Sequence, residues 1–158
     1  SIVLFFRQLL FFTAIGPTHV EISGHPLRPG NQYQVLLSQA GSVSFRRLEL
    51  FLELEEQATF RQGTDVRTER QVVWQSLIRR WNNVEPLSGT PFEAEVQLQL
   101  PSKAMHSFSS THNTVSWRLV LRGVPEHWPA LVRVFPVVVF PAEIISIDGK
   151  KAIVQTRT

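Results

Sequence analysis

Residues 92–122 read FEAEVQLQLPSKAMHSFSSTHNTVSWRLVLR, and this stretch decides the fold of the chain. Its first nine residues alternate between apolar and polar, the apolar set being Phe92, Ala94, Val96, Leu98 and Leu100. Because successive side chains of a strand point to opposite sides, these residues are predicted to form a strand with one buried and one solvated face. Pro101 ends it, since proline cannot donate to a sheet ladder. The alternation resumes over residues 115–122, so two half-buried strands joined by a polar loop predict a sheet that packs on a second sheet.

A second long strand is predicted over residues 42–56. Leu48, Leu50, Leu52 and Leu54 share one face. Val43 and Phe45 upstream have the opposite parity, and a phase slip of this kind near residues 46–47 indicates a β-bulge. A helix is the rival interpretation, but strict alternation over seven residues favours a strand.

The remaining segments give weaker patterns. Residues 60–68 are polar with a glycine and are predicted to be a turn, whereas residues 69–81 fit either a strand or a helix. Residues 131–140 are β-branched on both faces, which predicts that both faces are covered, and Pro136 indicates an edge position or a bulge. Asp148 and Gly149 lie between apolar runs and predict a hairpin turn.

Turn signals recur about every ten residues, as is typical of an all-β sandwich. We therefore expect a two-sheet antiparallel immunoglobulin-like sandwich of seven to nine strands. Residues 1–15 form a short hydrophobic N-terminal segment, residues 16–142 the sandwich domain, and residues 143–158 a C-terminal hairpin packed on or following it.

Length, composition and charge narrow the class of protein. The chain has 158 residues and is 43% hydrophobic, which suffices for one domain with its own core. It contains no cysteine, so disulfides and cysteine-based metal sites are excluded. The net charge is +3, but residues 16–142 hold 12 Lys and Arg against 11 Asp and Glu, without a polybasic run. The electrostatic pattern of a nucleic-acid binder is therefore missing, and no nucleic-acid partner is expected.

Residues 1–15 (SIVLFFRQLLFFTAI) are the most apolar part of the chain. They are fewer than the roughly 20 apolar residues of a membrane span, and Arg7 and Gln8 stand in their middle. Three interpretations stay open: the end of a transmembrane helix that begins upstream of Ser1, a helix on the membrane surface, or a first core element. We expect a membrane-associated protein, with the side of the membrane undetermined.

Catalytic and metal-binding patterns are weak. None of the five histidines, His19, His25, His106, His112 and His127, is paired at a spacing of two or four residues, so they are interpreted as solvated loop residues without a metal. The Gly-x-Ser-x-Gly motif of a nucleophile elbow and a glycine-rich phosphate loop are both missing. Pairs of glutamates fall on wet strand faces. We therefore expect neither an enzyme nor a cofactor.

Tryptophan and arginine are the candidates for binding. Trp117 lies on the apolar face of its strand and is predicted to be core. Trp74 and Trp128 are less constrained, and exposed tryptophans stack on sugars or anchor a protein partner. Arg70 and Arg79 belong to an arginine-rich segment that suits an anionic partner, although partial burial and a solvated strand face are the plainer interpretations.

The opening stretch resembles the arrestin-like superfamily, in which a strand ends in proline and a serine-containing loop leads to a strand with Trp-x-Leu. The matching residues here are Leu100-Pro101, Ser107, Asn113 and Trp117-Arg118-Leu119, and residues 135–141 resemble the closing strand. Residues 16–21, with Gly16, Thr18, Val20 and Glu21, also resemble the junction between a hydrophobic segment and the sandwich in uncharacterised bacterial membrane-attached proteins. The resemblance spans residues 16–141 and implies an arrestin-type fold, with no functional residue carried over.

These observations favour a non-catalytic interaction or scaffold module, the soluble part of a membrane-attached protein, that binds another protein through a sheet edge or a loop end. The alternative is a sandwich that binds a glycan or an anionic group through exposed tryptophan and arginine.

Overall fold

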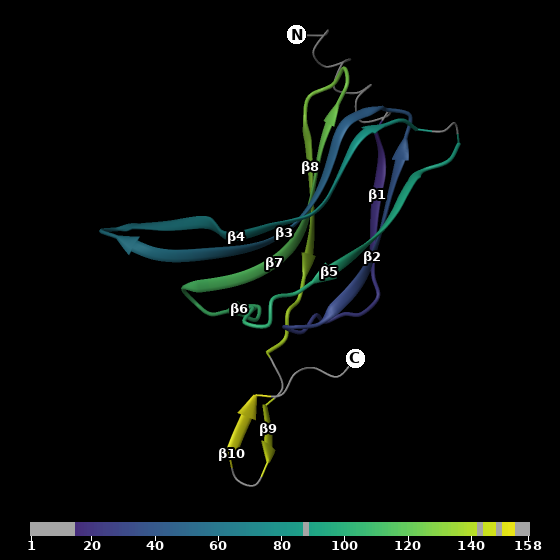
Figure 1. Cartoon of the computed structure of the whole chain (residues 1–158). Helices are drawn as coiled ribbons and strands as arrows, with labels where there is room; N and C mark the ends of the chain where they lie inside the picture. The colour runs from purple at the N-terminus through teal and green to yellow at the C-terminus, as the bar shows by residue number, and fades with distance from the viewer. Residues whose placement is uncertain (1–14, 87–88, 142–143, 148–149, 154–158) are drawn as a thin grey trace.

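The computed structural model describes residues 15–86, 89–141, 144–147 and 150–153, and every regular element in these ranges is a β-strand (Figure 1). Eight strands form two antiparallel sheets, which confirms the predicted all-β sandwich. The hydrophobic segment of residues 1–15 falls almost entirely outside the described residues. None of the described part of the chain forms a helix that is long and apolar enough to cross a membrane.

The smaller sheet has the strand order β1-β2-β5. Its members are β1 (Ile15–Ile22), β2 (Gln32–Gly41) and β5 (Phe92–Gln99). The alternation read from residues 92–100 is confirmed, because Val96, Leu98 and Leu100 are buried while Glu93 and Glu95 are exposed.

The larger sheet has the order β4-β3-β7-β6, and β8 also pairs with β7. Its members are β3 (Phe45–Gln62), β4 (Asp65–Val84), β6 (Phe108–Ser109), β7 (Asn113–Pro125) and β8 (Leu131–Val137). The rival helix at residues 48–57 is wrong, since these residues lie in β3, and the ambiguous residues 69–81 lie in the strand β4.

The core fills the space between the two sheets. Leucines at alternate positions of β3 and β7 face the inward side chains of β2 and β5, and most are fully buried. Trp117 is 2% exposed, which confirms its predicted core position, and its indole N–H donates to the carbonyl of Met105 at 2.6 Å. Burial of each such large apolar side chain stabilises the fold by about 1.5–3 kcal/mol.

The pairing of β3 with β7 shifts by one residue between Phe45 and Arg47, so the predicted bulge near residues 46–47 is confirmed. The extra residue lets both Phe45, 4% exposed, and Leu48, fully buried, point into the core despite their opposite parity.

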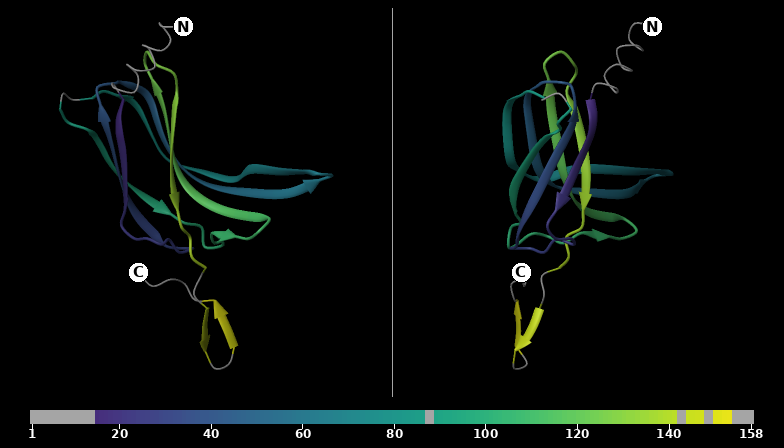
Figure 2. Two further views of the ribbon diagram at one scale, coloured as in Figure 1. Left: turned by 180° about the vertical axis from the view of Figure 1, so that it is seen from behind. Right: turned by 90° about the vertical axis from the view of Figure 1, so that its right-hand side faces the viewer.

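The distal parts of β3 and β4 form a hairpin that projects beyond the smaller sheet (Figure 2). The prediction of a turn over residues 60–68 is wrong, because Phe60 pairs with Arg67 and only residues 63–64 turn. Gly63 has a φ of 67°, as the first position of a two-residue type II′ turn requires. The segment is polar because solvent reaches both faces of the hairpin.

The strand β8 departs from its prediction in one respect. Pro136 lies in an edge strand, as predicted, since β8 pairs only with β7. The expectation that both faces are covered is wrong, because Val132 is 60% and Val134 45% exposed. One face packs on the core, and no described element lies over the other.

The C-terminal strands β9 (Ile144–Ile147) and β10 (Lys150–Ile153) pair as an antiparallel hairpin apart from the two sheets (Figure 1). The turn predicted at Asp148 and Gly149 lies outside the described residues.

Candidate functional site

The free edge of β8 is the first component of the candidate site. The backbone groups of alternate strand residues point to the same edge. Val138, just beyond β8, donates its N–H to His25 Nε2 at 3.1 Å and accepts from the N–H of Leu27 at 2.8 Å, so its backbone points away from β7. By the same parity, the N–H and C=O groups of Val132 and Val134 and the C=O of Pro136 also point away from β7. No described segment forms a strand with this part of the edge.

A groove lies between β8 and β1, the edge strand of the other sheet. It has a volume of about 370 Å³ and is lined mainly by apolar side chains: Val20, Ile22, His25, Leu119, Val134, Phe135, Pro136 and Val137. Arg133 closes one end by donating from Nη1 to Thr18 Oγ1 at 2.9 Å. His25 and Leu27 close the other end through their bonds to Val138. The two sheets are therefore tied together above and below an apolar opening.

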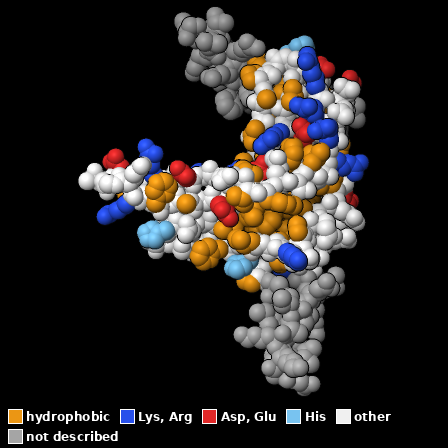
Figure 3. All heavy atoms as spheres, turned by 60° about the vertical axis from the view of Figure 1, so that its left-hand side comes forward, with side chains coloured by type: hydrophobic (Ala, Val, Ile, Leu, Met, Phe, Trp, Pro, Cys, Tyr) orange, Lys and Arg blue, Asp and Glu red, His pale blue; other side chains and the backbone are white. Residues whose placement is uncertain are grey.

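Exposed apolar side chains continue this surface. Val132, Val134, Val138 and Phe140 are each exposed by at least 41% and fall on alternate positions of one extended segment. Figure 3 shows hydrophobic side chains gathered across the middle of the face that it presents, with Lys and Arg side chains grouped above them. Exposed apolar patches and unpaired strand edges are both features at which proteins can bind partners.

The outer face of the larger sheet carries a lattice of charged side chains. Glu53 is 1% exposed and accepts hydrogen bonds from Gln75, Arg118 and Arg122. Glu49 pairs with Arg47 and Arg80 in the same way, and Arg122 lies 5.1 Å above the ring of Phe51. Among the described residues no buried side-chain polar atom lacks a partner, so the lattice is internally satisfied. The network links β3, β4 and β7 across this face.

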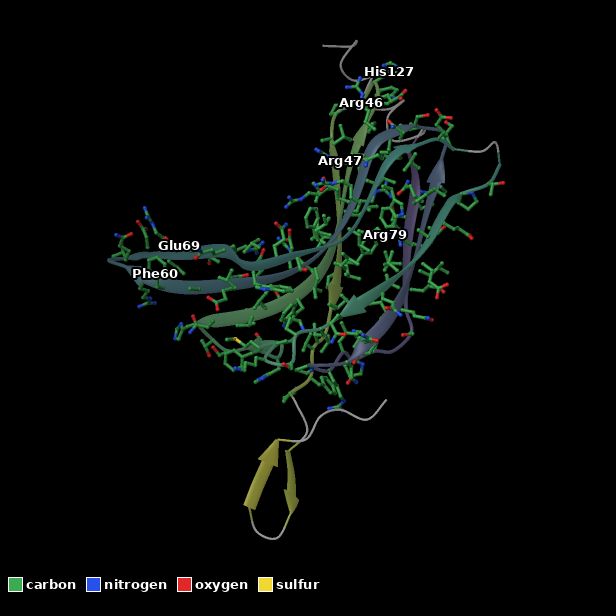
Figure 4. All side chains as sticks on the ribbon, viewed as in Figure 1. Arg46, Arg47, Phe60, Glu69, Arg79 and His127 are labelled. Atoms are coloured by element: carbon green, nitrogen blue, oxygen red, sulfur yellow. The ribbon has the colours of Figure 1, made fainter. Side chains whose placement is uncertain are left out.

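The four residues predicted to bind a ligand lie in separate places. Trp74 packs edge-on against Trp117 with ring centroids 5.6 Å apart, so it belongs to the margin of the core. Arg70 and Arg79 are exposed and lie nine residues apart along β4, and Trp128 lies in the β7–β8 connection beside His127. Figure 4 shows Arg79 between the far end of the hairpin and the end of the sheet marked by His127. Their binding role stays a prediction.

The histidines are likewise scattered. In the ranges that the structure describes, no three His, Asp or Glu side chains come together as a group able to hold a metal ion. His25 has a structural contact, because it accepts the Val138 N–H.

Sequence reasoning missed the β1–β8 groove. The signal was present in residues 131–140, where apolar side chains occupy both faces of a strand that proline marks as an edge.

Comparison with known proteins supports the fold of the chain and does not assign a function to it. No family model matches the chain, and no curated protein matches it. The sporulation control protein Spo0M from Bacillus subtilis matches with a TM-score of 0.55 and 10% identity over 81% of this chain and 50% of that chain. The chain thus spans half the length of Spo0M. A superoxide reductase (neelaredoxin) from Ignicoccus hospitalis matches with a TM-score of 0.47 and 13% identity over 80% of this chain and 82% of that chain. The likeness to Spo0M places the chain among two-sheet β-sandwiches.

Proposed function

We propose that this chain is a non-catalytic protein-interaction module with an arrestin-like sandwich, carried by a membrane-associated protein. The observation that supports it best is the edge of β8, where unpaired backbone groups and exposed Val132 and Val134 lie beside an apolar groove. Exposed apolar side chains beside an unpaired strand edge suit the binding of another protein.

Two further observations support the proposal. The structural neighbour Spo0M is described as a sporulation control protein, which is a regulatory role, although at 10% identity this is an analogy of fold. The apolar residues 1–15 suit a position next to a membrane. The arrestin-like part of the proposal rests on the resemblance of the motifs around Pro101 and Trp117.

A photo-crosslinking amino acid at Val132 tests the interaction. Placed in the full chain in its native cells, it is expected to give a defined protein adduct, identified by mass spectrometry. The matched control carries the same group at Val66, which is 62% exposed near the tip of the hairpin. A Val132 adduct that the Val66 control lacks supports the proposal. Identical adducts at both positions, or none at Val132 in the folded protein, contradict it.

Membrane association is tested in the same cells by separating membranes on a density gradient. The chain is expected in the membrane fraction, and its appearance only in the soluble fraction would contradict that part of the proposal.

A further inference from the structure

We infer that the edge of β8 binds its partner by strand addition: an extended segment of another polypeptide, with apolar side chains at alternate positions, pairs with residues 132–136 beside β1. This inference rests on the proposed function and specifies the binding mode. It follows from the backbone of β8, from the contacts that already exist at its end, and from the lining of the groove.

The backbone supplies the hydrogen bonds. Five outward groups, the N–H and C=O of Val132 and Val134 and the C=O of Pro136, have no strand partner among the described residues. Unpaired strand edges are templates for another strand, and main-chain hydrogen bonds provide the affinity in this mode of recognition.

Another segment of the same chain already pairs with this edge just beyond the end of β8. Leu27 donates its N–H to the carbonyl of Val138 at 2.8 Å and accepts from the N–H of Phe140 at 2.8 Å, which makes a parallel bridge with Val139. His25 Nε2 accepts the remaining outward N–H, that of Val138. The edge is therefore accessible to extended chain and correctly oriented for pairing, and a guest strand would continue an existing contact.

The groove defines the side chains of the guest. Residues of a strand paired with β8 point alternately towards the interior and towards solvent. The inward ones would meet Val20, Ile22 and Phe135, which line the opening. Apolar side chains of small or medium size fit this lining, whereas a charged side chain would be left without a partner.

A second copy of this chain fits the edge less well. Two β8 strands that overlap over their whole length place Pro136 of each copy opposite Val132 of the other. Since proline has no N–H, both Val132 carbonyls would then lack a donor. A guest without proline opposite Val132 satisfies all five outward groups of β8 and leaves only its own carbonyl opposite Pro136 without a donor.

Hydrogen exchange by NMR tests the pairing directly. The probe is a synthetic peptide selected by the full-length chain from a displayed library of random 12-residue sequences. In the free protein, the amides of Val132 and Val134 are expected to exchange quickly, and those of Arg133 and Phe135, which point towards β7, slowly. The peptide is expected to slow exchange at Val132 and Val134 by at least about tenfold, as a new main-chain hydrogen bond does.

Variants of β8 supply the second measurement. Val134→Pro removes one outward N–H, in a strand that already accommodates Pro136, and is expected to weaken peptide binding by about tenfold or more. The matched variant Val134→Thr keeps the N–H and the shape of the side chain and is expected to change affinity less than about threefold. Val132→Pro serves in the same way if Val134→Pro does not fold.

The outcomes separate the inference from the proposed function. A selected peptide that leaves both amides unprotected, or that binds Val134→Pro as tightly as Val134→Thr, overturns strand addition but keeps an interaction module. A concentration-dependent dimer that Val134→Pro abolishes shows a second copy on the edge and also overturns it. Selection of no peptide, together with no crosslinked protein at Val132, overturns both.

Discussion

Neutralising Glu53 should destabilise the fold far more than neutralising an exposed glutamate. The carboxylate of Glu53 lies on the outer face of the larger sheet, yet its side chain is only 1% exposed because its partners cover it. Glu53→Gln keeps the size of the side chain and removes the charge, so the variant measures the electrostatic contribution without leaving a cavity.

The magnitude follows from the contacts. Arg118 donates to Oε2 from Nε and Nη2, both at 3.0 Å, while Oε1 accepts from Gln75 at 2.6 Å and from Arg122 at 3.2 Å. Hydrogen bonds to charged groups contribute about 1.5–3 kcal/mol each, and breaking a fully buried ion pair costs about 3–5 kcal/mol. The arginine side chains are 26% and 47% exposed, so water partly compensates them, and Arg118 keeps its contact with Glu55. We expect Glu53→Gln to lower the free energy of unfolding by about 2–4 kcal/mol.

Urea unfolding followed by tryptophan fluorescence measures this cost as a shift of the midpoint at constant m-value. The matched control is Glu93→Gln on the outer face of the smaller sheet, where the side chain is exposed, and it is expected to change stability by less than about 0.5 kcal/mol. Arg118→Ala should cost more than Arg122→Ala, because Arg118 makes more bonds and is less exposed. A cost for Glu53→Gln equal to that of the control, or the reverse order of the two arginines, would refute the reasoning.

Three further substitutions probe the core, each measured by the same unfolding assay. Leu50→Ala removes a fully buried side chain and should cost about 2–5 kcal/mol, with a cost below 1 kcal/mol contradicting its position between the sheets. Gly123→Ala would place a Cβ atom 3.0 Å from the ring of Phe45, so we expect overpacking of about 1–3 kcal/mol, and a stabilised variant would show that the ring moves aside freely. Trp117→Phe loses the indole hydrogen bond to the carbonyl of Met105 and should lower the free energy of unfolding by about 1–3 kcal/mol. Unchanged stability would count against that bond.

The sequence predicts the fold well where one face of a strand is buried. Residues 92–100 alternate because the smaller sheet has one packed and one solvated face, and the parity slip before Leu48 marks a true bulge in β3. In both places the local sequence pattern reflects the tertiary packing, because each buried position requires an apolar residue.

The same logic explains the failure at the hairpin. Residues 59–68 are exposed or half-exposed on both faces, so their polar composition is that of a loop. Their strand structure comes from the pairing of β3 with β4, in which Thr59 and Thr68 bring their hydroxyl oxygens to 3.3 Å. Pairing between strands leaves no periodicity in a sequence when neither face is buried.

The sequence predicts binding residues from the types of their side chains, whereas the groove arises from the arrangement of two sheets. The groove lies where β1 pairs in the smaller sheet while Leu27, shortly after it, pairs with Val139, just beyond β8. Residues 131–140 indicate an apolar edge strand, but they do not reveal the opposite wall of the groove, which comes from a segment more than 100 residues earlier.

The wrong prediction that both faces of β8 are covered is still informative about the composition of this strand. Residues 131–137 carry apolar side chains on both faces, although the described part of the chain covers only the inner face. Pro136 removes one backbone donor from the edge, and natural proteins commonly use proline in this way to limit unwanted strand pairing. Val132 and Val134 nevertheless keep their outward N–H groups. In the proposed strand addition, the guest carbonyl opposite Pro136 has no donor in any register, so the guest gains most by pairing with Val132 and Val134.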